Sequence, residues 1–245
     1  MRILEGQGVT KLFGGLTAVS NVDFHVDQGE ILGLIGPNGA GKTTLFNLIS
    51  AALPLSSGEI RFKGQKINGL KPHRICKMGV SRTFQETKVF SNMPALQNVL
   101  VGAFFGTRTR VSGKDAAREA TQALEFVGLT AMSAAPIKDL TLVNQKRVEV
   151  ARALATKPEL LLLDELMAGL NAAEVSEAMQ LVTRIRDKGI TIVMVEHVMK
   201  AIMGICARVM VLHHGEKIAD GTCNEISCNK RVIEIYLGEE THAGS

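Results

Sequence analysis

The pattern of hydrophobic and polar positions changes character along the chain. Within residues 3–35, apolar and polar side chains alternate, most clearly at 22–26, and this period of two predicts short strands of an antiparallel edge sheet. Turn residues at 14–15 and 28–29 interrupt the alternation, and a continuous apolar run at 31–35 predicts a buried strand. The chain is therefore expected to begin with a small antiparallel sheet that leads into a buried strand.

A helical period follows a glycine-rich loop. Residues 43–53 contain few polar side chains and predict a helix that packs against a sheet. From 86 to 157 the spacing of apolar residues is mostly helical, so we expect a helical insertion there. Its helices are predicted at 96–105, 115–127 and 144–155, with a polar loop at 107–113.

Strands and helices alternate again in the last third of the chain. Apolar runs at 160–164 and 191–196 predict buried parallel strands on either side of a helix at 172–188. Two shorter runs, at 208–212 and 216–219, flank a His-His-Gly turn and predict a hairpin. The fold class is accordingly α/β.

We interpret residues 1–245 as a single domain with two parts. Residues 1–85 and 158–245 are expected to form an α/β core with an N-terminal antiparallel β-subdomain. Residues 86–157 are expected to form a helical subdomain that interrupts this core.

Composition excludes several classes of function. Of the 245 residues, 46% are hydrophobic and 21% are charged, which is typical of a globular protein. The net charge of +4 is scattered and forms no basic stripe, so no nucleic-acid partner is expected. The longest apolar runs fall far short of the roughly 20 residues of a transmembrane helix, so no membrane span is expected. Four cysteines without paired or zinc-like spacing, and no signal peptide, favour reduced cytoplasmic thiols.

The strongest candidate site is the glycine-rich loop between a predicted strand and a predicted helix. It fits the pattern G-x-x-x-x-G-K-[ST], in which backbone N–H groups wrap a phosphate at a helix N-terminus. Lys42 would bring a positive charge to the β- and γ-phosphates, and Thr43 would offer its hydroxyl to Mg²⁺. A chance glycine turn is the alternative, and the flanking strand and helix disfavour it. The predicted nucleotide-binding residues are Gly36, Pro37, Asn38, Gly39, Ala40, Gly41, Lys42, Thr43 and Thr44.

Two carboxylates follow the buried strand at 160–164. Ligands of open α/β sheets bind at the carboxyl ends of the strands. Asp164 is therefore placed to hold Mg²⁺ through water, and Glu165 to orient or polarise the water that attacks the γ-phosphate. The alternative, a helix N-cap pair after a core strand, is disfavoured by the presence of the glycine-rich loop.

His197 follows the strand at 191–196, at the same predicted edge of the sheet as Asp164. A lone histidine is more often structural, but a strand end at this edge favours a role for His197 on the nucleotide. The other histidines are interpreted as structural: His25, His73, His213, His214 and His242.

Together these residues resemble the ATP-binding subunits of ABC transporters, from about residue 3 to residue 238. The resemblance implies a P-loop ATPase fold with a RecA-like, mixed or parallel core, and ATP and Mg²⁺ as cofactors. Phe13 matches the aromatic residue that stacks on adenine, and Gln85 in SRTFQ matches the glutamine that touches Mg²⁺ and the membrane subunit. His197 matches the switch histidine, and the segment 167–171 resembles the D-loop.

Several fragments resemble, more narrowly, the Liv-type subunits that power import of branched-chain amino acids, with urea and short-amide importers as relatives. The fragments are FGGLTAV (13–19), PHRI (72–75), RTFQ (82–85), AGLN (168–171) and IYLGE (235–239). The resemblance implies an enzyme that hydrolyses ATP to ADP and phosphate at the cytoplasmic face of a bacterial membrane. Its implied partners are a second ATPase subunit, two membrane-spanning permease subunits and, indirectly, a substrate-binding protein.

The chain departs from the family at the signature LSGGQ, where residues 140–144 read LTLVN. Thr141 keeps a hydroxyl that would contact ATP bound to the other protomer, whereas Val143 replaces a glycine that lets the backbone approach the phosphate. A helix cap without any phosphate role is the alternative. Leu166 replaces the proline after the catalytic glutamate, and we expect this to have a minor effect. We therefore expect a heterodimer with asymmetric sites, in which the partner supplies an intact signature.

Three other functions remain as alternatives. A soluble ABC ATPase of translation or DNA repair is disfavoured because the chain has one glycine-rich loop and no heptad arm. A homodimeric ATPase of an exporter or lipid-transport system is disfavoured by the altered signature and by the Liv-type fragments. A regulatory subunit that no longer hydrolyses ATP is disfavoured by Glu165 and His197.

Overall fold

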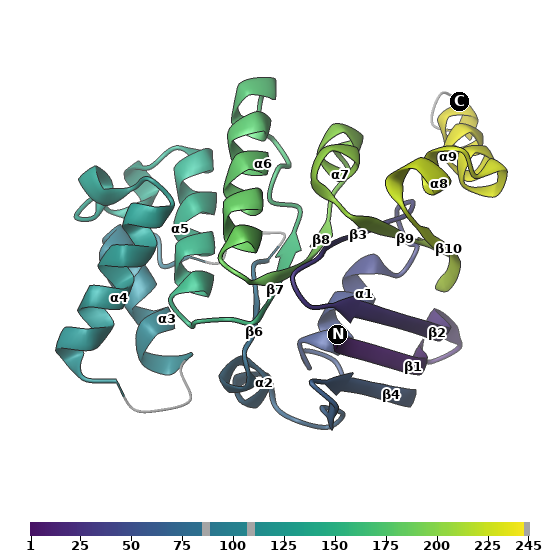
Figure 1. Cartoon of the computed structure of the whole chain (residues 1–245), viewed down its shortest axis with the longest axis horizontal. Helices are drawn as coiled ribbons and strands as arrows, with labels where there is room; N and C mark the ends of the chain where they lie inside the picture. Colours follow the sequence, from purple (N-terminus) through teal and green to yellow (C-terminus); the bar gives the residue numbers. More distant parts are fainter. Residues whose placement is uncertain (85–88, 107–110, 243–245) are drawn as a thin grey trace.

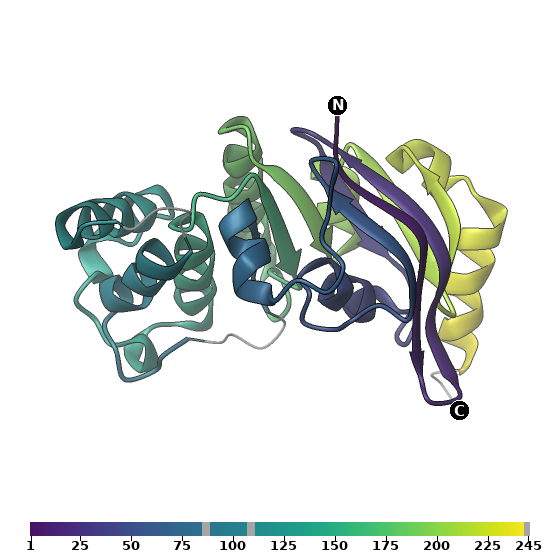
Figure 2. The same cartoon turned by 90° about the horizontal axis from the view of Figure 1, so that it is seen from below.

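The computed structural model describes residues 1–84, 89–106 and 111–242, with side chains described as far as residue 236. A six-stranded sheet occupies the centre, a four-stranded sheet lies beside it, and a group of helices lies at the opposite end (Figure 1). The view from below shows the same succession of parts (Figure 2). The fold is α/β, as predicted.

The four-stranded sheet begins with a long antiparallel hairpin of β1 (Arg2–Phe13) and β2 (Leu16–Asp27), joined by a turn with Gly14 at φ 57°. β1 also pairs with β4 (Ser57–Phe62), which pairs with β5 (Gln65–Lys66). The hairpin confirms the early strands predicted from the alternating pattern. β4 and β5 were not predicted, because their few apolar positions lie between glycines.

The six-stranded sheet has the order β10-β9-β3-β8-β7-β6, and every neighbouring pair is parallel except β9 and β10. The carboxyl ends of five strands therefore meet at one edge. Its strands are β3 (Ile31–Ile35), β6 (Val80–Arg82), β7 (Leu160–Asp164), β8 (Thr191–Val195), β9 (Arg208–His213) and β10 (Glu216–Gly221).

Alternate side chains of the central strands divide the hydrophobic core in two. On β7, Leu161 and Leu163 pack in the core formed with α5 (Leu142–Leu154), α6 (Ala172–Asp187) and α7 (Met199–Ile205). Leu160 and Leu162 pack in the core shared with α1 (Lys42–Ile49) and the four-stranded sheet. Full burial of each such leucine contributes about 1.5–3 kcal/mol. Because both faces of the sheet are covered, these strands are continuous apolar runs in the sequence.

Three helices pack against one another at the far end of the large sheet (Figure 1). α4 starts at Gly113, one residue inside the predicted loop, because the Ser112 hydroxyl accepts the backbone N–H of Asp115 at 3.2 Å. Residues 107–110 of that loop lie outside the described residues, and the proposed subdomain boundaries stay predictions. The helices are α3 (Ala95–Phe105), α4 (Gly113–Phe126) and α5 (Leu142–Leu154).

The helix predicted at 43–53 is shorter in the structure, where α1 spans Lys42–Ile49. Ala51 has φ 54°, a left-handed conformation that cannot continue a helix. None of the helices in the described residues is long and apolar enough to cross a bilayer. The helices not predicted from the sequence are α2 (Pro72–Met78), α7, α8 (Cys223–Ser227), α9 (Lys230–His242) and two 3₁₀ turns, Thr130–Met132 and Ile137–Asp139.

Candidate functional site

The glycine-rich loop lies between β3 and α1, and two of its glycines are required by close contacts. Gly36 has φ 150°, and a Cβ there would lie 2.1 Å from the carbonyl oxygen of Leu212. Gly41 has φ 101°, and a Cβ there would lie 2.5 Å from the carbonyl oxygen of Ala18. Any larger residue at either position would therefore push the loop away from the hairpins that support it.

Lys42, the first residue of α1, folds back over the loop. Its Nζ donates to the carbonyl oxygens of Gly36 at 2.6 Å and Pro37 at 2.8 Å, and its side chain is buried. The ammonium thus lies against the ring of backbone formed by the loop, at the positive end of α1. A buried cation at a helix N-terminus is suited to binding an anion.

The loop forms one wall of a cavity of about 530 Å³ at the edge where the parallel strands end. Phe13 lies at this cavity with its ring half-exposed, and the Nζ of Lys11 lies 5.0 Å from the ring centroid. His214, which carried no functional signal in the sequence, also lines the cavity. The lining residues are Phe13, Leu16, Thr17, Ala18, Asn38, Gly39, Ala40, Gly41, Lys42, Thr43, Thr44, Glu165, His197 and His214.

Asp164 ends β7 and is completely buried. Its Oδ2 accepts a hydrogen bond from Nη2 of Arg82 at 2.8 Å, whereas its Oδ1 has no hydrogen-bond partner among the described residues. Burial raises the pKa of this carboxyl group, and the hydrogen bond and charge of Arg82 oppose the rise. A buried carboxylate oxygen without a partner fits a role in holding a hydrated cation. Arg82 was missed by the sequence analysis, since nothing in SRTFQ indicates which carboxylate it meets.

Glu165 and His197 come together from two different strands. The Nε2 atom of His197 lies 3.2 Å from Oε1 of Glu165. Glu165 adopts a left-handed backbone conformation, with φ 52°, and its N–H donates to the carbonyl of Val195 at 2.9 Å. A non-glycine residue held in this conformation stores strain that the surrounding contacts must offset, a pattern common at functional sites.

Lys146 of α5 holds the backbone that follows β7. Its buried Nζ donates to the carbonyl oxygens of Glu165 and Leu166 at 2.9 Å each, and to that of Ala168 at 2.8 Å. Burial lowers the pKa of this ammonium, and the charge of nearby glutamates, Glu196 first among them, opposes the decrease. The predicted catalytic glutamate is thereby tied to the helical part of the molecule, a link that the sequence analysis did not find.

Glu196 precedes His197 and is buried behind the same segment. Its Oε1 accepts the backbone N–H of Met167 at 2.8 Å. Burial raises the pKa of Glu196 to about 7, against the opposing effects of the Met167 hydrogen bond and the charge of Lys146. This carboxyl group therefore changes charge near neutral pH.

Four predicted site residues are not among the described residues that line this cavity: Gly36, Pro37, Asp164 and Thr141. Thr141 is exposed at the start of α5, where its hydroxyl accepts the backbone N–H of Asn144 at 3.4 Å, and it is not among the described residues that line the cavity. It therefore acts as a helix cap within this chain. Gln85 lies outside the described residues.

Known proteins resemble this chain over nearly its whole length. The family profile described as ABC transporter matches residues 19–168, and that described as Branched-chain amino acid ATP-binding cassette transporter matches residues 216–242. The high-affinity branched-chain amino acid transport ATP-binding proteins BraF of Pseudomonas aeruginosa and LivG of Escherichia coli are each 39% identical, over 97% of this chain and 98% of theirs. The crystal structure of the ADP conformation of an ATP-binding cassette of an ABC transporter has a TM-score of 0.89 and 28% identity, covering 97% of this chain and 99% of that one.

Proposed function

The chain belongs to the ABC transporter family as an ATP-hydrolysing subunit, and from this premise we propose that it powers a bacterial importer of branched-chain amino acids. The observation that carries this proposal is the 39% identity to BraF and LivG over 97% of the chain. The match of residues 216–242 to the branched-chain family profile supports it. The subunit would lie at the cytoplasmic face of the membrane, held there by its permease partners.

The loop and Lys42 would bind the phosphates of ATP. Lys42 exchanges its hydrogen bonds to the loop carbonyls for phosphate oxygens, which carry a full negative charge and bind an ammonium more strongly. The N–H groups of residues 38–44 would surround the same phosphates at the start of α1. The half-exposed ring of Phe13, at the mouth of the cavity, would stack on adenine.

Glu165 and His197 would act on the γ-phosphate. Water attacks the γ-phosphorus while the Glu165 carboxylate accepts its proton, and the bond from phosphorus to the ADP oxygen breaks with both electrons leaving on ADP. His197 donates a hydrogen bond to a γ-phosphate oxygen and, at 3.2 Å from Glu165, limits the positions open to that carboxylate.

Three residues would hold Mg²⁺: Thr43 through its hydroxyl, Asp164 through water, and Gln85. The buried Oδ1 of Asp164, to which no residue that the structure describes donates a hydrogen bond, supports this assignment. When bound, Mg²⁺ supplies positive charge to the β- and γ-phosphates. Thr43 is exposed and lines the cavity, where its hydroxyl would be available to an ion bound to the phosphates.

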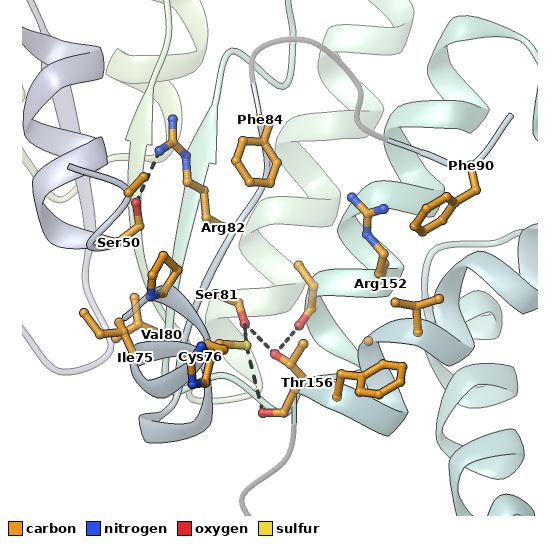
Figure 3. A pocket seen from close by; sticks show the side chains of 18 residues that line it. Ser50, Ile75, Cys76, Val80, Ser81, Arg82, Phe84, Phe90, Arg152 and Thr156 are labelled. Atoms are coloured by element: carbon orange, nitrogen blue, oxygen red, sulfur yellow. Dashed lines mark hydrogen bonds between the residues drawn. The ribbon is translucent and has the colours of Figure 1, made fainter. Parts of the chain in front are cut away.

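A second, mostly apolar cavity of about 470 Å³ would receive the membrane subunit. It lies between α2, β6, α3 and α5, with Phe84 and Phe90 in its wall (Figure 3), and Phe105 also lines it. Phe90 and Phe105, which both line this cavity, are 50% and 73% exposed, and neighbouring exposed aromatic side chains are typical of an interaction site. We propose that a helix of one permease subunit docks here, against Phe84 and its neighbours in the cavity wall.

We further propose that this chain pairs with a second, different ATPase subunit. The nucleotide cavity opens to solvent and Thr141 lies outside it, so a signature from another protomer would be needed to cover the γ-phosphate. Val143 blocks close backbone approach at the signature of this chain, so the two composite sites would differ in activity. A substrate-binding protein would contribute only through the permease subunits.

The test is reconstitution in liposomes of the complete transporter, with the second ATPase and both permease subunits. We expect ATP-dependent uptake of leucine and little uptake of urea. Glu165→Gln should still bind ATP yet lose at least about 100-fold in turnover, because the general base is gone. Lys42→Ala should lose ATP binding, and Glu216→Gln, an exposed glutamate in β10, serves as the matched control.

Three outcomes would contradict the proposal. Uptake of urea but not leucine would show that branched-chain amino acids are not the transported substrate. Full activity of the chain as a homodimer would reject the pairing with a different subunit. Wild-type hydrolysis by Glu165→Gln in the assembled complex would reject its catalytic role.

A further inference from the structure

Arg82 lies between the docking cavity and the nucleotide site. It is the last residue of β6, and its side chain lines the apolar cavity next to Phe84 (Figure 3). Only 8% of the side chain is exposed. One residue thus belongs both to the surface proposed for the permease and to the edge of the sheet at which ATP would bind.

The guanidinium group joins two elements of the nucleotide site. Nη2 donates to Oδ2 of Asp164 at 2.8 Å, at the end of β7. Nη1 donates to Oδ1 of Asn47 at 2.5 Å and to the hydroxyl of Ser50 at 3.3 Å, at the end of the helix that starts with Lys42. The planar fork of an arginine can make these bonds at the same time, which the single ammonium of a lysine cannot reproduce.

The Arg82 side chain also contacts two aromatic rings. Its guanidinium carbon lies 5.1 Å from the ring centroid of Phe84, on the cavity side, and 5.8 Å from that of Phe46 in α1. A partner side chain that packs on Phe84 must therefore press on the ring against which Arg82 lies. Because protein interiors are close-packed, such a displacement passes to the guanidinium group.

Asp164 depends on this arginine for its orientation. In the described part of the chain, Arg82 makes the only hydrogen bond to its carboxylate, since Oδ1 has none. A shift of Arg82 would therefore turn or release this carboxylate directly.

We propose that Arg82 is a positioning residue that couples occupation of the docking cavity to the geometry of Asp164. The inference rests on the proposed function, because it takes Asp164 as a group that holds Mg²⁺ with ATP. Docking of the permease would act on Asp164 through Phe84 and Arg82, in addition to any action through the segment that follows Phe84.

Arg82→Lys in the full-length chain tests this inference with two readouts. The first is calorimetric binding of ATP with and without Mg²⁺. We expect unchanged binding without Mg²⁺ and a loss of about tenfold in the Mg²⁺-dependent increase in affinity, the usual effect of removing a partner of a metal-binding carboxylate. The second is ATPase activity of the assembled transporter relative to the unassembled ATPase subunits, and we expect this stimulation to decrease.

The matched control is Arg208→Lys, because Arg208 forms similar ion pairs with carboxylates elsewhere in the sheet. Its guanidinium donates to Glu30 at 2.8 Å and to Asp220 at 2.7 Å, with 18% of its side chain exposed. We expect this variant to lose stability without any change in Mg²⁺ dependence or stimulation. Phe84→Leu, which keeps an apolar side chain but removes the ring, should reduce stimulation and leave ATP binding without Mg²⁺ unchanged.

The outcomes separate the inference from the function on which it rests. Wild-type Mg²⁺ dependence and stimulation in Arg82→Lys would overturn the inference alone, as would the same defects in Arg208→Lys. Absence of Mg²⁺-dependent ATP binding by the wild-type chain would overturn both the proposed function and the inference.

Discussion

The buried carboxyl group of Glu196 allows a quantitative test of the structure through the substitution Glu196→Gln. Its pKa is raised from an ordinary 4.5 to about 7 by burial behind the segment that follows β7. Glutamine keeps a carbonyl oxygen that can accept the backbone N–H of Met167, which Glu196 binds at 2.8 Å. The substitution therefore removes the titration and preserves the shape and the hydrogen bond.

The sign of the effect follows from which state binds the proton more tightly. Between pH 4.5 and about 7 the folded chain holds a proton on Glu196 that the unfolded chain has lost, so raising the pH favours unfolding. The contribution of the protonated Glu196 carboxyl group to the free energy of unfolding is fully present below pH 4.5 and is lost as the pH rises through about 7. Each pKa unit corresponds to about 1.4 kcal/mol, so the loss is about 3 kcal/mol at pH 8.

Urea unfolding of the wild type and of Glu196→Gln at pH 5 and pH 8 measures this difference. We expect similar free energies of unfolding at pH 5, and a variant that is more stable by up to about 3 kcal/mol at pH 8. Glu216→Gln, an exposed position, should change stability by less than about 0.5 kcal/mol at either pH. Equal effects of Glu196→Gln at both pH values, or a destabilised variant at pH 8, would refute the reasoning.

Two further substitutions test other contacts of the site. Lys146→Met removes the donor for three carbonyls within residues 165–168, and should lower the free energy of unfolding by about 2–3 kcal/mol. It should also lower kcat by a larger factor than it changes KM. Unchanged urea unfolding would show that these hydrogen bonds make no net contribution to stability. Gly36→Ala should abolish ATP binding and lower the free energy of unfolding by about 3 kcal/mol or more, because the added Cβ would lie 2.1 Å from the carbonyl oxygen of Leu212. Gly39→Ala is the control, since Gly39 has φ 78° but nothing lies within 4 Å of an added Cβ. This variant should lower the free energy of unfolding by only about 1–2 kcal/mol, as measured by calorimetric melting.

Local features of the sequence sufficed for the main elements and for the phosphate loop. The strand predicted at 160–164 coincides with β7, and the helix predicted at 172–188 ends one residue later than α6. The strand is a continuous apolar run, the helix has a clear amphipathic period, and the loop has a fixed spacing of glycine and lysine. Predictions failed where an element has few apolar positions, as in β4, where it is a single short helix, as in α7, or where a backbone conformation intervened, as at Ala51 after α1.

The sequence by itself determined the α/β class, the ATPase family, and the placing of the glycine-rich loop, Glu165 and His197 at one cavity, because each depends on residues close together in the chain or on the edge at which parallel strands end. Only the tertiary structure decided which side chains support them. Arg82 meets Asp164 across 82 positions of the chain, and Lys146 reaches three carbonyls about 20 positions away. Such contacts depend on the relative placement of packed elements to within a hydrogen-bond length, and residue spacing along the chain carries no record of that placement.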